Sequence, residues 1–169
     1  MKNLILIRHA KSSWDAPLKD IDRPLNNRGI LDAQLVASNC QNSIPSPFLI
    51  QCSTAKRAKE TALIIAATIL YPIENIVFKE ELYTFDESKL EKIIKSSSND
   101  FENCILFGHN EAITNFVNKI TKSVSKKEKK NLPSIITQFG RFIERLITFC
   151  YCHVCDYLCV AFLVFRQFR

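Results

Sequence analysis

The chain has 169 residues, enough for one domain with a sizeable core, and its 47% hydrophobic and 24% charged residues are typical of a soluble globular protein. It has only three glycines, which excludes the glycine-rich phosphate loops of dinucleotide-binding folds and P-loop NTPases. Residues 122–169 hold 9 Lys/Arg against 3 Asp/Glu and account for the net charge of +6. Because no recognition motif accompanies this charge, we expect no nucleic-acid binding.

The N-terminal apolar run is short. Leu4–Ile7 is followed directly by Arg8, which does not fit a secretory signal peptide. The seven cysteines have no spacing typical of a disulfide framework, so we expect reduced thiols. We therefore expect a cytoplasmic protein without a membrane anchor.

Predicted strands and helices alternate along the first 120 residues. The apolar runs predict strands at Lys2–Ile7, Phe48–Cys52, Ile76–Phe78 and Cys104–Phe107, and helical spacing predicts helices at Arg28–Gln41, Ala55–Leu70, Asp86–Lys95 and Glu111–Ile120. Strands that are apolar throughout, without alternation, are typical of burial on both faces. This order predicts a three-layer α/β/α domain around a mostly parallel sheet.

Two of the three histidines follow predicted strands. His9 comes after the first strand, next to Arg8, and His109 comes after the fourth. Ligands of open α/β sheets bind outside the carboxyl ends of the strands. We therefore expect both histidines at one edge of the sheet, although an isolated Arg-His pair would more often be a core histidine beside a surface arginine.

Arginines join this predicted cluster. Arg57 lies in the first turn of the helix that follows the second strand, and Arg23 and Arg28 flank a proline-marked loop. Guanidinium groups match phosphate oxygens, and helix N-termini add backbone N–H donors. The pattern predicts an anion site.

A histidine in such a site can also react. A neutral imidazole can attack phosphorus and hold the phosphoryl group covalently until water hydrolyses it. The arginines and the second histidine would stabilise charge on the phosphoryl oxygens. No cluster of carboxylates has metal-ligand spacing, so we expect neither a metal nor another cofactor.

Four motifs, in this order, carry a resemblance to a known family. They are Arg8-His9-Ala10-Lys11-Ser12-Ser13-Trp14, Asp22-Arg23-Pro24-Leu25 with Arg28-Gly29, the segment from Ser53 to Ala62, and Gly108-His109-Asn110. Together they resemble the histidine phosphatase superfamily, which is phosphoglycerate mutase-like, and within it the SixA-type phosphohistidine phosphatases. Alanine at position 10, in place of the superfamily's usual glycine, is typical of that branch. The resemblance covers residues 1 to about 134 and implies the superfamily's fold.

The resemblance implies roles for individual residues. His9 would be the nucleophile that accepts the phosphoryl group, and Arg8, Arg57 and His109 would complete the phosphate pocket. Further phosphate-binding positions would be Lys11, Arg23 and Asn110.

Two further residues have alternative interpretations. Other branches of the superfamily use a carboxylate as proton donor, and Glu81 is the nearest candidate, but a solvated surface carboxylate is the stronger interpretation. Trp14 is expected to pack in the ordinary way; the alternative is an aromatic residue at the rim of the site that contacts a protein substrate.

Residues 135–169 depart from the family pattern and form a separate segment rich in Phe and Cys. From Pro133 onward there is no clear strand-turn-strand rhythm, and the plain interpretation is an irregular apolar terminus that packs on the sheet or is partly disordered. We hypothesise that the segment is an aberrant reading, such as a frameshift, which sequencing of the coding region would test. Loss of the family's final strands would leave an exposed apolar sheet edge. Two less favoured interpretations are a zinc site at Cys150-x-Cys152-His153-x-Cys155 and a membrane helix over 146–165.

The leading functional hypothesis is a metal-independent phosphohistidine phosphatase; the absence of large lid insertions fits a shallow site that is open to a macromolecular substrate. Its substrate would be a phosphorylated protein, either a histidine-containing phosphotransfer domain or a phosphotransfer-system protein, and we expect a monomer. The alternatives are a phosphomonoesterase acting on small metabolites and an inactive module that binds phosphate or a phosphoprotein.

Overall fold

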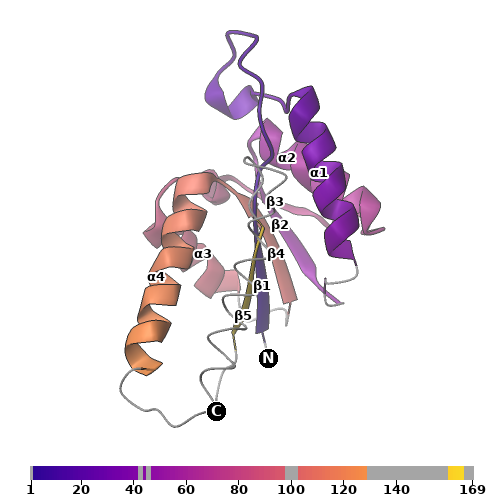
Figure 1. Cartoon of the computed structure of the whole chain (residues 1–169). Coiled ribbons are helices and arrows are strands. Elements are labelled where there is room, and N and C mark those ends of the chain that lie inside the picture. The colour runs from indigo at the N-terminus through magenta and orange to yellow at the C-terminus, as the bar shows by residue number, and fades with distance from the viewer. Residues whose placement is uncertain (1, 42–43, 45–46, 98–102, 129–159, 166–169) are drawn as a thin grey trace.

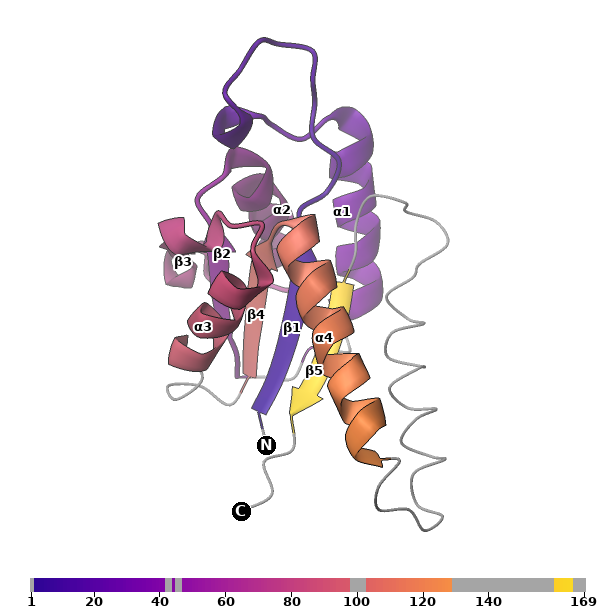
Figure 2. The ribbon, with the colours of Figure 1, turned by 90° about the vertical axis from the view of Figure 1, so that its left-hand side faces the viewer.

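The computed structural model describes residues 2–41, 44, 47–97, 103–128 and 160–165 (Figure 1). A five-stranded sheet with the order β3-β2-β4-β1-β5 forms the middle layer. Helices α1 and α2 pack together on one face, and α3 and α4 pack together on the other, as Figures 1 and 2 show. The predicted three-layer α/β/α fold is confirmed.

The observed elements lie close to their predicted positions, except that α4 continues eight residues beyond its predicted end and β5 was not predicted. The strands are β1 (Lys2–Arg8), β2 (Leu49–Ser53), β3 (Val77–Lys79), β4 (Asn103–Gly108) and β5 (Val160–Phe165). The helices are α1 (Asn27–Cys40), α2 (Lys56–Thr68), α3 (Glu87–Ser97) and α4 (Asn110–Glu128), with short 3-10 helices η1 (Asp20–Asp22), η3 (Ile73–Asn75) and η4 (Glu80–Leu82) between them.

Strands β3, β2, β4 and β1 run parallel, and their carboxyl ends meet at one edge of the sheet. In the register of β1 and β4, Arg8 lies opposite Gly108, so the residues that follow these two strands are neighbours. The backbone N–H of His9 donates to the carbonyl of Gly108 at 3.1 Å, which extends the pairing to the first residue of the candidate site.

The segment after β1 folds back on itself before α1. Residues Ser12 and Leu25 form an isolated antiparallel bridge, and the N–H of Asn26 donates to the carbonyl of Lys11 at 3.0 Å. We call residues 14–23, which this pairing closes off, the 14–23 loop; it stands beyond the carboxyl ends of the strands (Figure 1). The loop therefore overhangs the edge where the site was predicted.

Helix α1 begins where local chemistry favours it. The side chain of Asn26 accepts a hydrogen bond from the Gly29 N–H at 2.8 Å, which is a typical N-cap. Gly29 is required for a different reason, since a Cβ there would overlap the backbone carbonyl of Lys11. The glycine lets the first turn of α1 pack directly on the backbone that follows the β1 strand.

The C-terminal segment contains a strand that the sequence analysis did not predict. Strand β5 runs antiparallel to β1 along the side that β4 leaves unpaired. The edge of β1 is therefore paired with β5. The exposed apolar sheet edge that was expected from the loss of the final strands is not found there. The remaining residues of 135–169, with the Cys150–Cys155 cluster and most of the 146–165 segment, lie outside the described residues.

None of the helices in the described ranges combines the length and the apolar character that crossing a bilayer demands. Within the same ranges, no group of three or more His, Cys, Asp or Glu side chains is arranged to hold a metal ion.

Candidate active site

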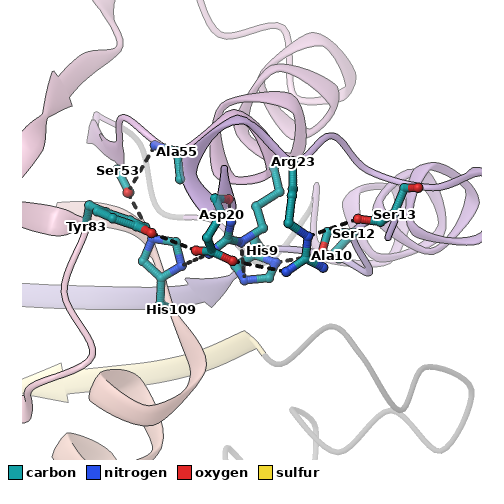
Figure 3. A network of polar contacts seen from close by, with 11 residues as sticks. His9, Ala10, Ser12, Ser13, Asp20, Arg23, Ser53, Ala55, Tyr83 and His109 are labelled. Atoms are coloured by element: carbon teal, nitrogen blue, oxygen red, sulfur yellow. Dashed lines mark hydrogen bonds and ion pairs between the residues drawn. The ribbon is translucent and has the colours of Figure 1, made fainter. Parts of the chain in front are cut away.

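The two strand-end histidines meet at the carboxyl edge of the sheet. The ring centroids of His9 and His109 are 5.2 Å apart in an edge-to-face arrangement. His109 is almost fully buried, and His9 is partly buried. The structure thus brings together the two residues that the strand pattern placed at this edge, as Figure 3 shows.

The hydrogen bonds of His9 define which ring nitrogen is free to react. Nδ1 lies 2.8 Å from the carbonyl oxygen of Ala10, which can only accept, so Nδ1 carries the proton. Nε2 lies 3.0 Å from Nε of Arg57, which can only donate, so Nε2 holds a lone pair. His9 therefore has the tautomer of a nucleophile, with Nε2 as the attacking atom.

The surroundings of His9 keep its ring neutral. Burial is the largest cause, and the positive charges of Arg57 and Arg8 add to it, while the Ala10 carbonyl and Asp20 oppose them. The net result lowers the pKa of His9 from 6.5 to about 4. At neutral pH the Nε2 lone pair is available.

Arg57 connects the members of the site. Its side chain is buried, with a relative exposure of 3%, and it extends from the first turn of α2. Besides His9, the guanidinium donates to Nδ1 of His109 at 3.4 Å and to a carboxylate oxygen of Asp20 at 2.8 Å. The Asp20 carbonyl oxygen accepts a further short bond from Nη1. A buried cation with donors directed at both histidines is a suitable binder for phosphoryl oxygens.

Ser53 fixes the second histidine. Because Nδ1 of His109 accepts from Arg57, Nε2 carries the proton and donates to the Ser53 hydroxyl at 3.0 Å. Burial, followed by the neighbouring His9 and Arg57, lowers the pKa of His109 to about 3. His109 is thus a second neutral ring beside the nucleophile.

Asp20 is the carboxylate of this network. Its Oδ2 accepts from the Tyr83 hydroxyl at 2.7 Å, and its Oδ1 accepts from Arg23 at 3.0 Å. Burial alone would raise the pKa of Asp20, but the hydrogen bonds from Tyr83, Arg57 and Arg23 outweigh it and lower the pKa to about 2. Asp20 is therefore ionised at any physiological pH.

The remaining predicted phosphate-binding positions lie at different depths. The charge of Arg8, at the end of β1, lowers the pKa of both histidines and so acts within the site. Arg23 is buried and bonds Ser12 and the Ser13 carbonyl as well as Asp20, so it braces the 14–23 loop. Lys11 is partly buried beside this loop. Asn110 is exposed at the start of α4 and accepts from Thr114 at 3.1 Å.

The proposed acid Glu81 lies away from this network. It is exposed in η4 and lines a surface hollow that contains none of the cluster residues, together with Phe78, Lys79, Glu80, Ile93 and Ser96. Among the described residues, no hydrogen bond or ion pair links Glu81 to either histidine. Its use as a proton donor stays a prediction, and the surface interpretation fits this position better.

The expectation that Trp14 packs in the ordinary way is wrong. Its side chain is 79% exposed on the 14–23 loop, and the Arg23 guanidinium lies over its ring. This exposed position is compatible with the alternative interpretation, in which Trp14 contacts a protein substrate at the rim of the site.

Sequence reasoning missed several residues that complete the site. The resemblance motif included Asp22, whereas the structure places Asp20, two residues earlier, on Arg57. Tyr83 and Phe85 have ring centroids 5.1 Å from that of His109 and were given no role. Ser53 was part of a motif and directly follows the predicted strand Phe48–Cys52, which was a signal that could have been used.

A second connection holds the nucleophile segment on α2. The Thr61 hydroxyl accepts from the N–H of Ala10 at 3.1 Å and donates to the Arg57 carbonyl at 2.7 Å. Glu60 accepts from the N–H of Leu25 at 2.6 Å. Thr61 therefore holds the backbone that follows β1 on α2 near Arg57, and Glu60 holds the segment that precedes α1 on the same helix.

Comparison with known sequences identifies relatives in plants and bacteria. An uncharacterised chloroplast protein of Arabidopsis thaliana is 36% identical over 119 residues, which cover 65% of this chain and 55% of that protein. An uncharacterised protein of Mycobacterium leprae is 31% identical over 112 residues, covering 64% of this chain and 66% of that protein. The chain spans between about half and two thirds of the length of these curated relatives.

Solved structures share the fold. A protein assigned as the phosphohistidine phosphatase SixA of Agrobacterium tumefaciens matches with a TM-score of 0.62 and 28% identity, over 70% of this chain and 76% of that one. The protein histidine phosphatase SixA in complex with tungstate matches with a TM-score of 0.61 and 19% identity, over 68% and 74% of the two chains. At that lower identity the likeness shows the fold alone.

The sequence profile of one family matches residues 4–103, more than half of the chain. Those residues contain most of β1, the 14–23 loop, β2 and α2, and thus His9, Asp20 and Arg57. This match shows that the chain belongs to the histidine phosphatase superfamily, branch 1.

Proposed function

We propose that this protein is a metal-independent phosphatase that removes the phosphoryl group from phosphohistidine in a protein. The observation that carries the proposal is the state of the carboxylates around His9. Asp20, the one carboxylate bonded into the described network, has a pKa of about 2 and holds no proton to give. Glu81 lies apart from the network.

The identity of the leaving group follows from that observation. An alcohol leaving group needs a proton from an acid as its bond to phosphorus breaks. The imidazole of a phosphohistidine can be protonated on its own ring nitrogen, so it depends less on an enzyme acid. A site with a neutral nucleophile and an ionised carboxylate therefore suits a P–N bond better than a P–O ester bond.

The steps use the groups already described. Nε2 of His9 attacks phosphorus and forms a P–N bond, and the bond to the substrate imidazole breaks with its electron pair returning to that ring. Arg57, His109 and the charge of Arg8 stabilise the negative charge on the phosphoryl oxygens. Water then attacks the phosphoryl group on His9, releases inorganic phosphate and restores the neutral ring.

The proposed partner is a phosphorylated protein, of the type found in histidine-containing phosphotransfer domains or phosphotransfer-system proteins. The exposed rings of Trp14 and Phe85 near the site support a macromolecular substrate, because aromatic residues are enriched at protein interfaces. A docked protein would bury both rings, whereas a small metabolite would bury little of their surface.

The test compares a P–N and a P–O substrate on the full chain. A histidine-containing phosphotransfer domain phosphorylated by phosphoramidate supplies the first, and para-nitrophenyl phosphate supplies the second. We expect His9-dependent loss of the phosphohistidine and weak ester hydrolysis. His9→Ala and Arg57→Ala should abolish turnover, whereas Lys56→Ala, which removes a neighbouring exposed charge on α2, should not.

Other outcomes would replace the proposal. Strong ester hydrolysis without loss of phosphohistidine would indicate a phosphomonoesterase for small molecules. Phosphate binding without turnover of either substrate, by a folded protein, would indicate a binding module.

A further inference from the structure

Four of the five N–H donors of Arg57 that could bind a phosphoryl group already have acceptors among the described residues. Asp20 takes two of the four bonds that the guanidinium makes, one through Oδ2 and one through its backbone carbonyl. The two histidines take the others. A phosphoryl group that is to accept two parallel bonds from Arg57 must therefore replace at least one internal acceptor.

The side-chain carboxylate of Asp20 is the group in this network that can move away from Arg57. Its side chain is 45% exposed, whereas that of Arg57 is 3% exposed. The carboxylate sits on the 14–23 loop and can turn into water, where its charge is solvated. The guanidinium is buried under the loop and has no such alternative.

Hydrogen bonds from three residues hold the Asp20 carboxylate in place as long as no phosphoryl group is bound. Besides Arg57, Oδ2 accepts from the Tyr83 hydroxyl and Oδ1 accepts from Arg23, which also braces Ser12 (Figure 3). Tyr83 comes from the segment between β3 and α3, so Asp20 joins two loops that flank the histidines. These hydrogen bonds fix the orientation of the Asp20 carboxylate, which is therefore not a surface side chain that rotates freely.

We propose that Asp20 is an internal competitor for the phosphate site, whose carboxylate lowers the affinity of Arg57 for a phosphoryl group and so favours release of inorganic phosphate. This inference rests on the proposed use of the site for phosphoryl groups. A phosphoprotein brings further contacts that can compensate for the competition, but free phosphate brings none.

A purely structural role for Asp20 predicts the opposite sign. If the carboxylate served only to orient Arg57, its removal would loosen the guanidinium and weaken phosphate binding. If it competes, its removal frees the donors and strengthens phosphate binding. The direction of the change in affinity therefore separates the two roles.

The experiment measures binding of inorganic phosphate to the full chain by titration calorimetry at pH 8, where phosphate is a dianion and both histidines are neutral. Asp20→Asn keeps the size of the side chain and one acceptor but removes the charge. Because a charge-assisted hydrogen bond is roughly twice as strong as a neutral one, we expect about tenfold tighter binding.

A matched variant controls for the change in net charge. Asp22→Asn makes the same change in the same 3-10 helix, at an exposed carboxylate that has no recorded bond to Arg57 among the described residues. We expect unchanged binding. Equal tightening in Asp20→Asn and Asp22→Asn, or unchanged or weaker binding in Asp20→Asn, would overturn the proposal.

A second variant covers the case in which Asp20→Asn fails to fold. Tyr83→Phe keeps the ring against His109 and removes one of the bonds that hold Asp20. We expect phosphate to bind about two- to fivefold more tightly, in keeping with the modest net strength of one hydrogen bond. Unchanged or weaker binding would count against the competitor.

The result is separable from the choice of substrate. If the protein fails to dephosphorylate phosphohistidine but Asp20→Asn still binds phosphate more tightly, the substrate assignment is wrong and the competition stands. If phosphohistidine is hydrolysed but Asp20→Asn binds phosphate no more tightly, the competition is wrong and the substrate assignment stands.

Discussion

Burial of two neutral histidines should make the protein sensitive to mild acid. The pKa values of His9 and His109 are lowered to about 4 and about 3, from 6.5 in the unfolded chain. Between pH 7 and pH 5 the unfolded chain takes up protons at these positions, and the folded protein does not. The free energy of unfolding must therefore fall as the pH falls through this window.

The size of this loss in unfolding free energy follows from the interval of 1.5 pH units between the pKa of 6.5 in the unfolded chain and pH 5. One pKa unit corresponds to about 1.36 kcal/mol, so each histidine should lose about 2 kcal/mol of stability between pH 7 and pH 5. Together they would lose about 4 kcal/mol, a large part of the roughly 5–15 kcal/mol that stabilises an ordinary domain. Carboxyl groups contribute little here, because those of the unfolded chain titrate mostly below pH 5.

The assay is urea unfolding at pH 7, 6 and 5, followed by far-UV circular dichroism. Tryptophan fluorescence would be a poor probe, because Trp14 is the only tryptophan and is already 79% exposed. The control is a double variant, His9→Gln with His109→Gln, in which any contribution from His153 is unchanged. We expect the double variant to lose much less stability than the parent over this range. An equal loss in both proteins, or a parent whose stability is flat between pH 7 and pH 5, would refute the reasoning.

Three further predictions concern activity and backbone geometry. Above pH 5, kcat/KM should show no acid limb beyond that of the substrate's own phosphoryl group, because the pKa of His9 is lowered to about 4; an additional limb near 6.5, shared by substrates with different phosphoryl pKa values, would contradict the buried neutral ring. Gly29→Ala should lower the free energy of unfolding by about 1–3 kcal/mol in thermal or urea unfolding, because the collision is with the Lys11 backbone and outweighs alanine's helix propensity. Leu70→Gly should raise stability by about 1 kcal/mol, since Leu70 lies just beyond the end of α2 with φ 57° and is 85% exposed; no gain in melting temperature would refute this.

The positions of the strands and of the first site residues could be predicted because they depend on local pattern. Continuous apolar runs marked β1 and β4, and their parallel direction fixed where His9 and His109 would meet. Arg57 could be placed because it follows a strand and begins a helix. Each of these inferences needs only the order of elements and the geometry of a parallel sheet.

The contacts of loops could not be predicted in the same way. Asp20 and Tyr83 are 63 residues apart, and nothing in the sequence around either residue specifies that the two side chains meet over Arg57. Trp14 shows the converse, since an apolar ring gives no local sign that it lies exposed on a loop. Strand β5 was missed because its apolar run lies within the longer, mostly apolar stretch 146–165, which gives no local sign of where a strand begins.

Trapping of the covalent intermediate tests the central claim most directly. The full chain would be mixed with the phosphorylated phosphotransfer domain, quenched within milliseconds in alkali, in which phosphohistidine is stable, and digested for mass spectrometry. The account predicts a phosphoryl group on the peptide that contains His9, and neither phosphopeptide nor turnover in His9→Ala. Turnover that persists in His9→Ala, or a phosphoryl group found on another residue while His9 stays unmodified, would contradict it.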